Sequence, residues 1–215
     1  IYFMLAITTI FVTSFVVALS GAMMPGPLLS VTISESPRRG YMTGPLLIAG
    51  HGILEAALIL ALILGMAPIL QRSEVFIATA MGGSAILLWM AYGMFRSLPN
   101  LTLRADPAKA RSNSLLFAGI FMSLANPYWT IWWVTIGLGY ILQSSTQGNW
   151  GVFAFFSGHI LADLVWYTTI STVVWKGKEF MSDRSYRILI GSCAGFLIVF
   201  SCLFAYSGIA KAFTP

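Results

Sequence analysis

One short pattern occurs twice in this sequence, in two distant apolar segments: Gly50-His51-Gly52-Ile53-Leu54-Glu55 and Gly158-His159-Ile160-Leu161-Ala162-Asp163. Both stretches read glycine, histidine, three further residues and an acid. The histidine and the acid stand four positions apart, which places them on the same face of a helix. The shared pattern indicates an internal repeat. The alternative is a coincidence among residues that are common in membrane helices, and the match makes coincidence the weaker explanation.

Other features recur in the same order at nearly the same spacing. A proline recurs after 102 positions (Pro25 and Pro127), the histidine after 108, and a glycine that opens a small-residue stretch after 109 (Gly82 and Gly191). A unit of three membrane-crossing helices ends on the side opposite to its start, so a second copy has the inverted orientation. Inverted repeats are typical of secondary transporters, whose substrate site lies at the repeat interface near the middle of the membrane.

The composition is that of a membrane protein. Of the 215 residues, 58% are hydrophobic and 9% are charged, whereas a soluble domain carries about 25% charged residues. A soluble fold of this size could not hide so much apolar surface from water, and a bilayer removes that requirement. Six segments are long and apolar enough to span it. They are 2–33, 43–70, 74–98, 114–142, 151–175 and 187–213.

We therefore predict an all-α integral membrane protein with six transmembrane helices, built as two inverted three-helix repeats with breaks in helices one and four. The chain forms a single membrane domain, 1–215, with repeat one at about 2–98 and repeat two at about 114–213. The first segment contains a Pro-Gly-Pro sequence and lacks a small-residue cleavage pattern. We interpret it as a spanning helix and not as a signal peptide.

The basic residues predict the orientation in the plasma membrane. The twelve Lys and Arg residues are dispersed over the connections, which argues against nucleic-acid binding. Ten follow the first, third and fifth segments: Arg38, Arg39, Arg96, Arg104, Lys109, Arg111, Lys176, Lys178, Arg184 and Arg187. The other two are Arg72 and Lys211. Because basic connections stay in the cytoplasm, we expect those three connections inside the cell and both termini outside.

Proline and glycine interrupt the first and fourth segments. Pro25 and Pro27 remove two backbone donors, and Gly26 tolerates almost any backbone angle, so the helix should break there. Asn126-Pro127 should act in the same way but more mildly, and Asn126 adds an amide that both donates and accepts hydrogen bonds. Broken backbone at membrane depth must be buried in protein or face a water-filled cavity. We predict that these five residues shape a substrate site; the alternative is a kinked helix packed for shape.

Two histidines and two acids lie within apolar helices. A charged side chain inside a membrane costs about 2.5–3.5 kcal/mol even on lenient scales, so it needs a partner or a function. We expect His51, Glu55, His159 and Asp163 to converge in the interior of the bundle. One interpretation is a proton relay, or recognition of a substrate amine; another is a metal site with imidazole and carboxylate ligands. The third is structural hydrogen bonding between helices. We expect no cofactor.

The aromatic residues and the cysteines suggest packing. Four aromatic residues follow the second break: Tyr128, Trp129, Trp132 and Trp133. Some can line a substrate cavity, but a position at the membrane interface or in helix packing accounts for most of them. Cys193 and Cys202, the two cysteines, form neither a CxxC motif nor a metal pair. We expect both to be small core residues.

The chain resembles the lysine exporter (LysE/RhtB) superfamily of small bacterial and archaeal efflux proteins over nearly its whole length. The resemblance rests on Ala22-Met23-Met24-Pro25-Gly26-Pro27, on Asn126-Pro127, on the six-helix length and on the polar connection 99–113. It implies export of amino acids or similar small metabolites by proton exchange, often by a homodimer. The doubled histidine and acid is not a usual feature of the amino-acid exporters. Related branches that move metal cations use intramembrane histidines and acids, so this departure concerns the substrate.

The leading hypothesis is a proton-coupled amino-acid exporter. In it, the residues of the two breaks bind the substrate, and the four histidine and acid side chains carry protons or hold the substrate amine. A divalent metal exporter that uses the same four side chains is the alternative. An enzyme or a thiol–disulfide carrier is disfavoured, because the sequence has no recognisable nucleophile motif, no Gly-rich phosphate loop and no CxxC. A membrane scaffold would not explain the buried acids or the paired breaks.

Overall fold

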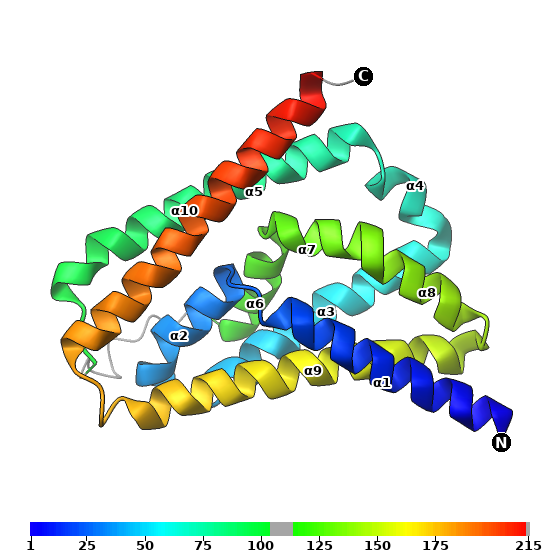
Figure 1. The fold of residues 1–215 in the computed structure, drawn as a ribbon, viewed down its shortest axis with the longest axis horizontal. Helices are drawn as coiled ribbons and strands as arrows, with labels where there is room; N and C mark the ends of the chain where they lie inside the picture. Colours follow the sequence, from blue (N-terminus) through cyan, green and yellow to red (C-terminus); the bar gives the residue numbers. More distant parts are fainter. Residues whose placement is uncertain (104–113, 214–215) are drawn as a thin grey trace.

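The computed structural model describes residues 1–103 and 114–213, and all regular secondary structure in these two ranges is helical (Figure 1). The helices are α1 (Tyr2–Ala22), α2 (Pro27–Arg39), α3 (Thr43–Ala61), α4 (Ala67–Leu70), α5 (Ser73–Ser97), α6 (Leu115–Leu124), α7 (Pro127–Trp132), α8 (Leu138–Ser145), α9 (Gly148–Gly177) and α10 (Asp183–Phe213). The π-helical turns Leu62–Met66 and Trp133–Gly137 join α3 to α4 and α7 to α8, and the 3₁₀ turn Leu98–Asn100 follows α5.

The helical fold class is confirmed, and each of the six predicted segments is helical. Four stretches are long and apolar enough to cross a membrane: Tyr2–Ala22, Thr43–Leu70, Ser73–Asn100 and Asp183–Phe213. The fourth predicted segment is interrupted, so that α6 has only 10 residues. The fifth, α9, has 30 residues but carries a histidine and an aspartate in its middle. Six crossings and the inverted arrangement therefore remain predictions.

Both predicted helix breaks are present. α1 ends at Ala22, and α2 begins at Pro27 after Gly26, whose backbone is fully extended. α6 ends at Leu124, and α7 begins at Pro127, because the residue before a proline is displaced from helical geometry. Asn126 is that residue, and its side-chain oxygen accepts a hydrogen bond of 3.2 Å from the Tyr128 N–H. Pro27 and Pro127 are thus the first residues of new helices. At that position the missing backbone N–H of proline would have no intrahelical acceptor in any case.

Some segment boundaries differ from the prediction. α2 continues through Pro37 and ends only at Gly40, which adopts a left-handed φ of 81°. Arg38 and Arg39 therefore lie in the last turn of α2 and not in a loop. Cationic side chains are favourable there because they oppose the negative end of the helix dipole. Likewise α10 begins at Asp183, so that the basic residues after it are helical. Part of the predicted polar connection 99–113, with its three basic residues after position 103, lies outside the described residues.

Glycines bring the helices of the bundle close together. α1 packs along α9, α3 packs against α6, and α3 also contacts α9 (Figure 1). A Cβ atom on Gly50 would overlap the carbonyl group of Leu116, and one on Gly158 would overlap the carbonyl oxygen of Phe11. These two glycines open the repeated segments. Each therefore lets its helix approach a neighbour at backbone distance, as small residues do in membrane helices.

α5 and α10 run side by side as a second unit of the bundle (Figure 1). Ser84 and Ser201 join them at the centre: each hydroxyl donates to the carbonyl oxygen of the other residue at 2.9 Å. Gly83 admits the ring of Pro127, which would collide with a Cβ there. The pair thus packs directly against the second helix break.

Apolar side chains cover much of the outer surface. Trp89, Phe117 and Tyr206 are exposed by 69%, 71% and 73%. They belong to a large set of exposed aliphatic and aromatic residues spread over α1, α3, α5, α6, α9 and α10. A soluble monomer rarely exposes contiguous apolar surface on this scale, so this surface fits a lipid environment.

The prediction for the cysteines holds for one of them. Cys193 is half-buried and packs against the cluster that contains Ile33 and Ile190. Cys202 is exposed, so its assignment to the core was wrong. The two lie nine positions apart on α10, and this spacing is not a whole number of helical turns. The two side chains therefore occupy different faces.

Candidate functional site

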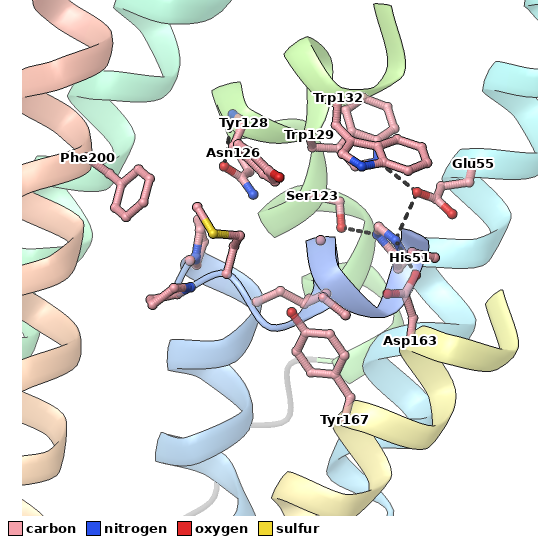
Figure 2. Close-up of a pocket in the computed structure, with 18 of the residues that line it drawn as sticks. His51, Glu55, Ser123, Asn126, Tyr128, Trp129, Trp132, Asp163, Tyr167 and Phe200 are labelled. Carbon is pink, nitrogen blue, oxygen red and sulfur yellow. Dashed lines mark hydrogen bonds and ion pairs between the residues drawn. The ribbon is translucent and has the colours of Figure 1, made fainter. Parts of the chain in front are cut away.

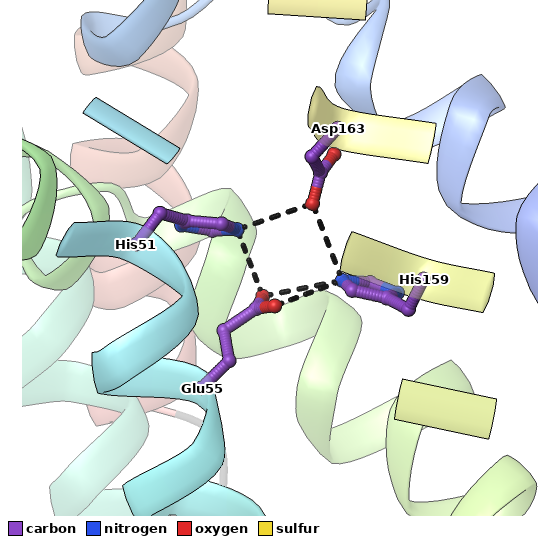
Figure 3. Close-up of side chains that lie close together, drawn as sticks. All are labelled: His51, Glu55, His159 and Asp163. Atoms are coloured by element: carbon purple, nitrogen blue, oxygen red, sulfur yellow. Dashed lines mark hydrogen bonds and ion pairs between the residues drawn. The ribbon is translucent and has the colours of Figure 1, made fainter. Parts of the chain in front are cut away.

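The structure brings the two repeated histidine–acid pairs together. His51 and Glu55 lie one turn apart on α3, and His159 and Asp163 lie one turn apart on α9 (Figure 3). We call these four residues the quartet. Their exposed fractions are 6%, 1%, 5% and 5% in that order, so all four are buried. One nitrogen or oxygen from each lies within 4.8 Å of those from the other three.

Histidines and acids alternate around the quartet. His51 Nε2 lies 3.0 Å from Glu55 Oε1 and 3.4 Å from Asp163 Oδ2. His159 Nε2 lies 3.1 Å from Glu55 Oε2 and 3.6 Å from Asp163 Oδ2 (Figure 3). Each acid therefore lies between two histidines, one on its own helix and one on the facing helix. Opposite charges placed in this way offset part of the cost of burial.

Three residues outside the quartet hold its α3 half. The indole N–H of Trp129 donates to Glu55 Oε1 at 3.0 Å (Figure 2), and that of Trp133 donates to the same oxygen at 2.9 Å. Ser123 Oγ lies 2.6 Å from His51 Nδ1 and also donates to the carbonyl oxygen of Gly119 at 2.7 Å. Because its one hydrogen is used in that bond, the serine oxygen accepts from the Nδ1–H of His51. This contact directs His51 Nε2 toward the centre of the quartet.

Sequence reasoning did not assign these three residues to the site. It allowed some of the aromatic residues a place in a substrate cavity, but it ascribed most of them to the membrane interface or to packing. Their spacing contained a signal, because Trp129 and Trp133 stand four positions apart on one helix face, as His51 and Glu55 do. Ser123 gave no such signal, since serine is common in membrane helices and bonds its own backbone.

The α9 half of the quartet has fewer polar partners. The His159 ring packs against Trp132, Trp133 and Phe155, with ring centroids 4.8, 5.5 and 5.9 Å away. Among the described residues, His159 Nδ1, Glu55 Oε2 and Asp163 Oδ2 are buried without a hydrogen-bond partner. Buried polar atoms are nearly always hydrogen-bonded, so these three atoms call for a further partner such as a water molecule, an ion or a solute.

The quartet borders a cavity of about 80 Å³ that also reaches both helix breaks (Figure 2). Pro25, Gly26 and Pro27 line it from the first break, and Asn126 lines it from the second. The two breaks face each other, because a Cβ on Gly26 would lie 3.5 Å from Asn126 Nδ2.

Pro127, the fifth predicted substrate residue, does not line this cavity. It is fully buried and packs against Gly83. Pro127 is the first residue of α7 and its ring faces Gly83 of α5, whereas the side chain of Asn126 faces the cavity. The structure thus gives Pro127 a packing position and places the other four residues of the breaks on the cavity wall.

This arrangement can bind a cation. Two carboxylates and two imidazoles converge in an apolar surrounding, where charge interactions are stronger than in water. A proton, a substrate amine or a metal ion can each occupy such a site, and the ligand atoms meet the spacing that a metal needs. Ion pairs that only join α3 to α9 are the remaining interpretation.

Comparison with known proteins agrees with the resemblance drawn from the breaks. A family model described as LysE type translocator matches residues 19–208, which include both breaks and the quartet. The Chemotactic transduction protein ChpE of Pseudomonas aeruginosa is 25% identical over 175 residues, which is 81% of this chain and 86% of that protein. No solved structure matches the chain. With its apolar surface and long helices, the chain is a multi-pass membrane transport protein that belongs to the LysE type translocator family.

Proposed function

We propose that the chain is a secondary transporter of the plasma membrane that exports amino acids or similar small metabolites in exchange for protons. The observation that carries this proposal is the cavity in which the buried quartet and the two helix breaks meet (Figure 2). Family membership supports transport in general. Export and proton exchange are what the resemblance implies, and the chemistry of the cavity supports the class of solute.

The cavity wall has two chemically different parts, which match the two charged groups of an amino acid. At the first break, the first intrahelical hydrogen bond of α2 is the one that the Ser30 N–H donates to Gly26 O at 3.0 Å. The amides before Ser30 therefore have no acceptor within the helix. No side chain caps this end, so the amides of Leu28 and Leu29 are suited to an anionic group such as a carboxylate. The carboxylates of the quartet are suited to the amine.

The packing supports the proposed inverted repeat. The contact of α1 with α9 has a counterpart in the contact of α6 with α3. The close approach of Gly158 to Phe11 likewise matches that of Gly50 to Leu116. In the proposed repeat, the first segment corresponds to the fourth and the second to the fifth. Replacing each segment by its counterpart turns the contact of α1 with α9 into the contact of α6 with α3. We therefore propose six crossings and a pseudo-two-fold axis in the membrane plane.

Contacts among described residues of the three basic connections support the predicted orientation. Lys178 Nζ, after α9, donates to the carbonyl oxygen of Pro37 at the end of α2 at 3.2 Å. Arg187 Nε donates to the carbonyl oxygen of Leu101, after α5, at 2.9 Å. These contacts support our proposal that the first, third and fifth connections share the cytoplasmic side.

Cysteine labelling tests this orientation. In a chain whose two native cysteines are replaced by serine, we introduce a single cysteine at Asn149 or at Ser182, both of which are exposed. A membrane-impermeant thiol reagent added to intact cells should label the first and spare the second. Labelling of the Ser182→Cys variant from outside would overturn the orientation.

A divalent metal cation is the second candidate solute. The observation in its favour is that the four side chains of the quartet offer two nitrogens and two oxygens within 4.8 Å of one another. An amine would use only the carboxylates of this set.

Transport by the purified protein tests the proposal. We expect vesicles that contain the full chain to accumulate one or more radiolabelled amino acids when a pH gradient is imposed, and not when an ionophore dissipates it. Asn126→Ala should slow this uptake, because Asn126 lines the cavity between the two breaks. Asn149→Ala is the matched control, because Asn149 is exposed at the start of α9. Uptake that the pH gradient does not affect, or equal rates in both variants, would refute the proposal.

A further inference from the structure

We infer that the quartet is a four-ligand binding site for one divalent transition-metal ion of the Zn²⁺ class. The four short contacts carry the argument. Histidine nitrogens and carboxylate oxygens bind Zn²⁺ at about 2.0–2.2 Å, which places neighbouring ligand atoms about 3.3–3.5 Å apart in a tetrahedron. With one oxygen taken from each acid, Glu55 Oε1 and Asp163 Oδ2, the four nitrogen–oxygen distances are 3.0, 3.3, 3.4 and 3.6 Å, which bracket this value (Figure 3).

The surrounding hydrogen bonds orient His51 and Glu55 as a metal site requires. A histidine that binds a metal donates its other ring N–H to a neighbouring acceptor, which fixes the tautomer. His51 does so through Nδ1, which donates to Ser123 Oγ, so its Nε2 lone pair faces the quartet. Trp129 and Trp133 both donate to Glu55 Oε1, which also lies 3.0 Å from His51 Nε2, and Oε2 lies 3.1 Å from His159 Nε2. A liganding carboxylate is likewise held by hydrogen bonds from its surroundings.

Two buried oxygens point to a cation. Among the described residues, only the histidine Nε2 atoms approach Glu55 Oε2 and Asp163 Oδ2, at 3.1 to 3.6 Å, and neither oxygen has a regular hydrogen bond. Both belong to side chains that are more than nine-tenths buried and face the quartet (Figure 3). A divalent ion between them would contact both oxygens, and its two positive charges equal the two negative charges of the carboxylates. The site as a whole would then be neutral, which is the condition for burial in an apolar bundle.

The ligand set favours a particular class of ion. Ca²⁺ and Mg²⁺ take six or more oxygen ligands, and the quartet offers two acidic side chains and two imidazoles. Mixed nitrogen and oxygen ligands in a four-coordinate site suit Zn²⁺ and its spectroscopic substitute Co²⁺. Trp132, Trp133 and Phe155 pack against His159 and limit the number of further ligands. The adjacent cavity, which all four residues line, provides a path of entry.

The competing interpretation is a permanent ion-pair cluster between the two helices. It accounts for the alternation of histidine and acid, but the two histidine Nε2–H groups would then be the sole described donors to Glu55 Oε2 and Asp163 Oδ2, at 3.1 to 3.6 Å. It also gives no reason for the histidine Nε2 atoms to lie between both acids, since each protonated nitrogen has one hydrogen to donate. Metal binding goes beyond the proposed function, because it requires neither transport nor an amino-acid substrate.

Binding of Zn²⁺ alone to the purified full chain in detergent, after treatment with a chelator, tests the inference. We expect calorimetry to show one saturable Zn²⁺ site per chain. Asp163→Asn should weaken Zn²⁺ binding about 100-fold or more, because it removes a ligand, and Trp133→Phe should weaken it about 10- to 100-fold, because it removes a donor to Glu55. Glu74→Gln is the matched control and should bind as the wild type does, since Glu74 is exposed at the start of α5.

A measurement on the wild type removes the dependence on variants that fold poorly. Co²⁺-loaded protein should show the intense visible absorption of a four-coordinate ion. X-ray absorption of the Zn²⁺ form should show nitrogen and oxygen neighbours at about 2.0–2.1 Å and no sulfur. Absence of saturable binding, a six-coordinate Co²⁺ spectrum, or unchanged affinity in Asp163→Asn would each overturn the inference. Amino-acid transport without Zn²⁺ binding would overturn the metal site and leave the proposed function standing. Zn²⁺ binding without amino-acid transport would overturn the proposed function and leave the metal site standing.

Discussion

The two histidine–acid pairs share one sequence pattern but have different surroundings. Glu55 accepts hydrogen bonds from two tryptophans, and His51 is held by Ser123. Among the described residues, Asp163 Oδ2 and His159 Nδ1 have no hydrogen-bond partner, and aromatic rings surround His159. The pair on α3 is thus fixed by its neighbours, whereas the pair on α9 is placed mainly by packing.

The difference comes from the helices that face each pair. The segment from α6 to the π-helical turn after α7 supplies the serine and the tryptophans to the α3 pair. α1 faces the quartet with small residues instead: Ala18, Gly21 and Ala22 line the cavity. Small side chains leave the room in which a solute can reach the α9 pair. A repeated pattern can therefore serve a rigid half and an open half of one site.

The largest expected effect distinguishes the two acids. Glu55→Ala leaves two buried indole N–H groups and a histidine without their acceptor, which should lower the free energy of unfolding by about 3–5 kcal/mol. Asp163→Ala removes no indole donor and only the longer contacts of 3.4 and 3.6 Å to the two histidines, so it should cost about 1–3 kcal/mol. Denaturant unfolding of the purified variants in detergent, followed by tryptophan fluorescence, measures both. Equal losses would show that the two halves of the quartet are held alike.

The next effect concerns a single tryptophan. Trp133→Phe removes one hydrogen bond to the Glu55 carboxylate, and a bond to a charged group contributes about 1.5–3 kcal/mol. Trp132→Phe makes the same change of ring size beside His159 but removes no bond to the quartet, so its cost should be smaller. The same unfolding assay compares them. A larger loss in Trp132→Phe would mean that ring packing holds the quartet more than the indole donors do.

The two glycines that open the repeated segments should behave alike, in contrast to the acids. Gly50→Ala and Gly158→Ala each place a methyl group against a backbone carbonyl of the neighbouring helix, and such overpacking costs about 1–3 kcal/mol. Gly82→Ala is the control, because no other residue lies within 4 Å of a Cβ at Gly82. Melting temperatures in detergent rank the three variants. If Gly158→Ala is neutral while Gly50→Ala is not, the packing is unequal as well.

The smallest effect is expected at Ser123. Ser123→Ala removes the acceptor for His51 Nδ1–H and should reduce the free energy of unfolding by about 0.5–1.5 kcal/mol. Ser145→Ala, on an exposed face of α8, should leave it unchanged. Chemical unfolding of both variants under one set of conditions provides the comparison. A neutral result at Ser123 would remove the serine from the account of why the α3 pair is rigid.

Much of the fold followed from local rules in the sequence. Apolar runs indicated the helices, and the prolines indicated where two of them break, because the ring acts on the turn just before it. The end of α2 was predicted too early: the helix tolerates Pro37 and continues to the left-handed Gly40. Pro127 was placed in the substrate site, whereas its ring fits against Gly83, a neighbour on another helix that local rules do not reveal.

The sequence by itself determined that this is a membrane protein, where its helices break, and that each histidine shares a helix face with an acid. These properties depend on composition and on contacts within about one helical turn. Only the tertiary structure decided that the two pairs meet, that Ser123 and two tryptophans hold one of them, and that the cavity reaches both breaks. Those contacts join residues 72 to 104 positions apart. They depend on how closely whole helices approach each other, which the glycines permit but do not specify.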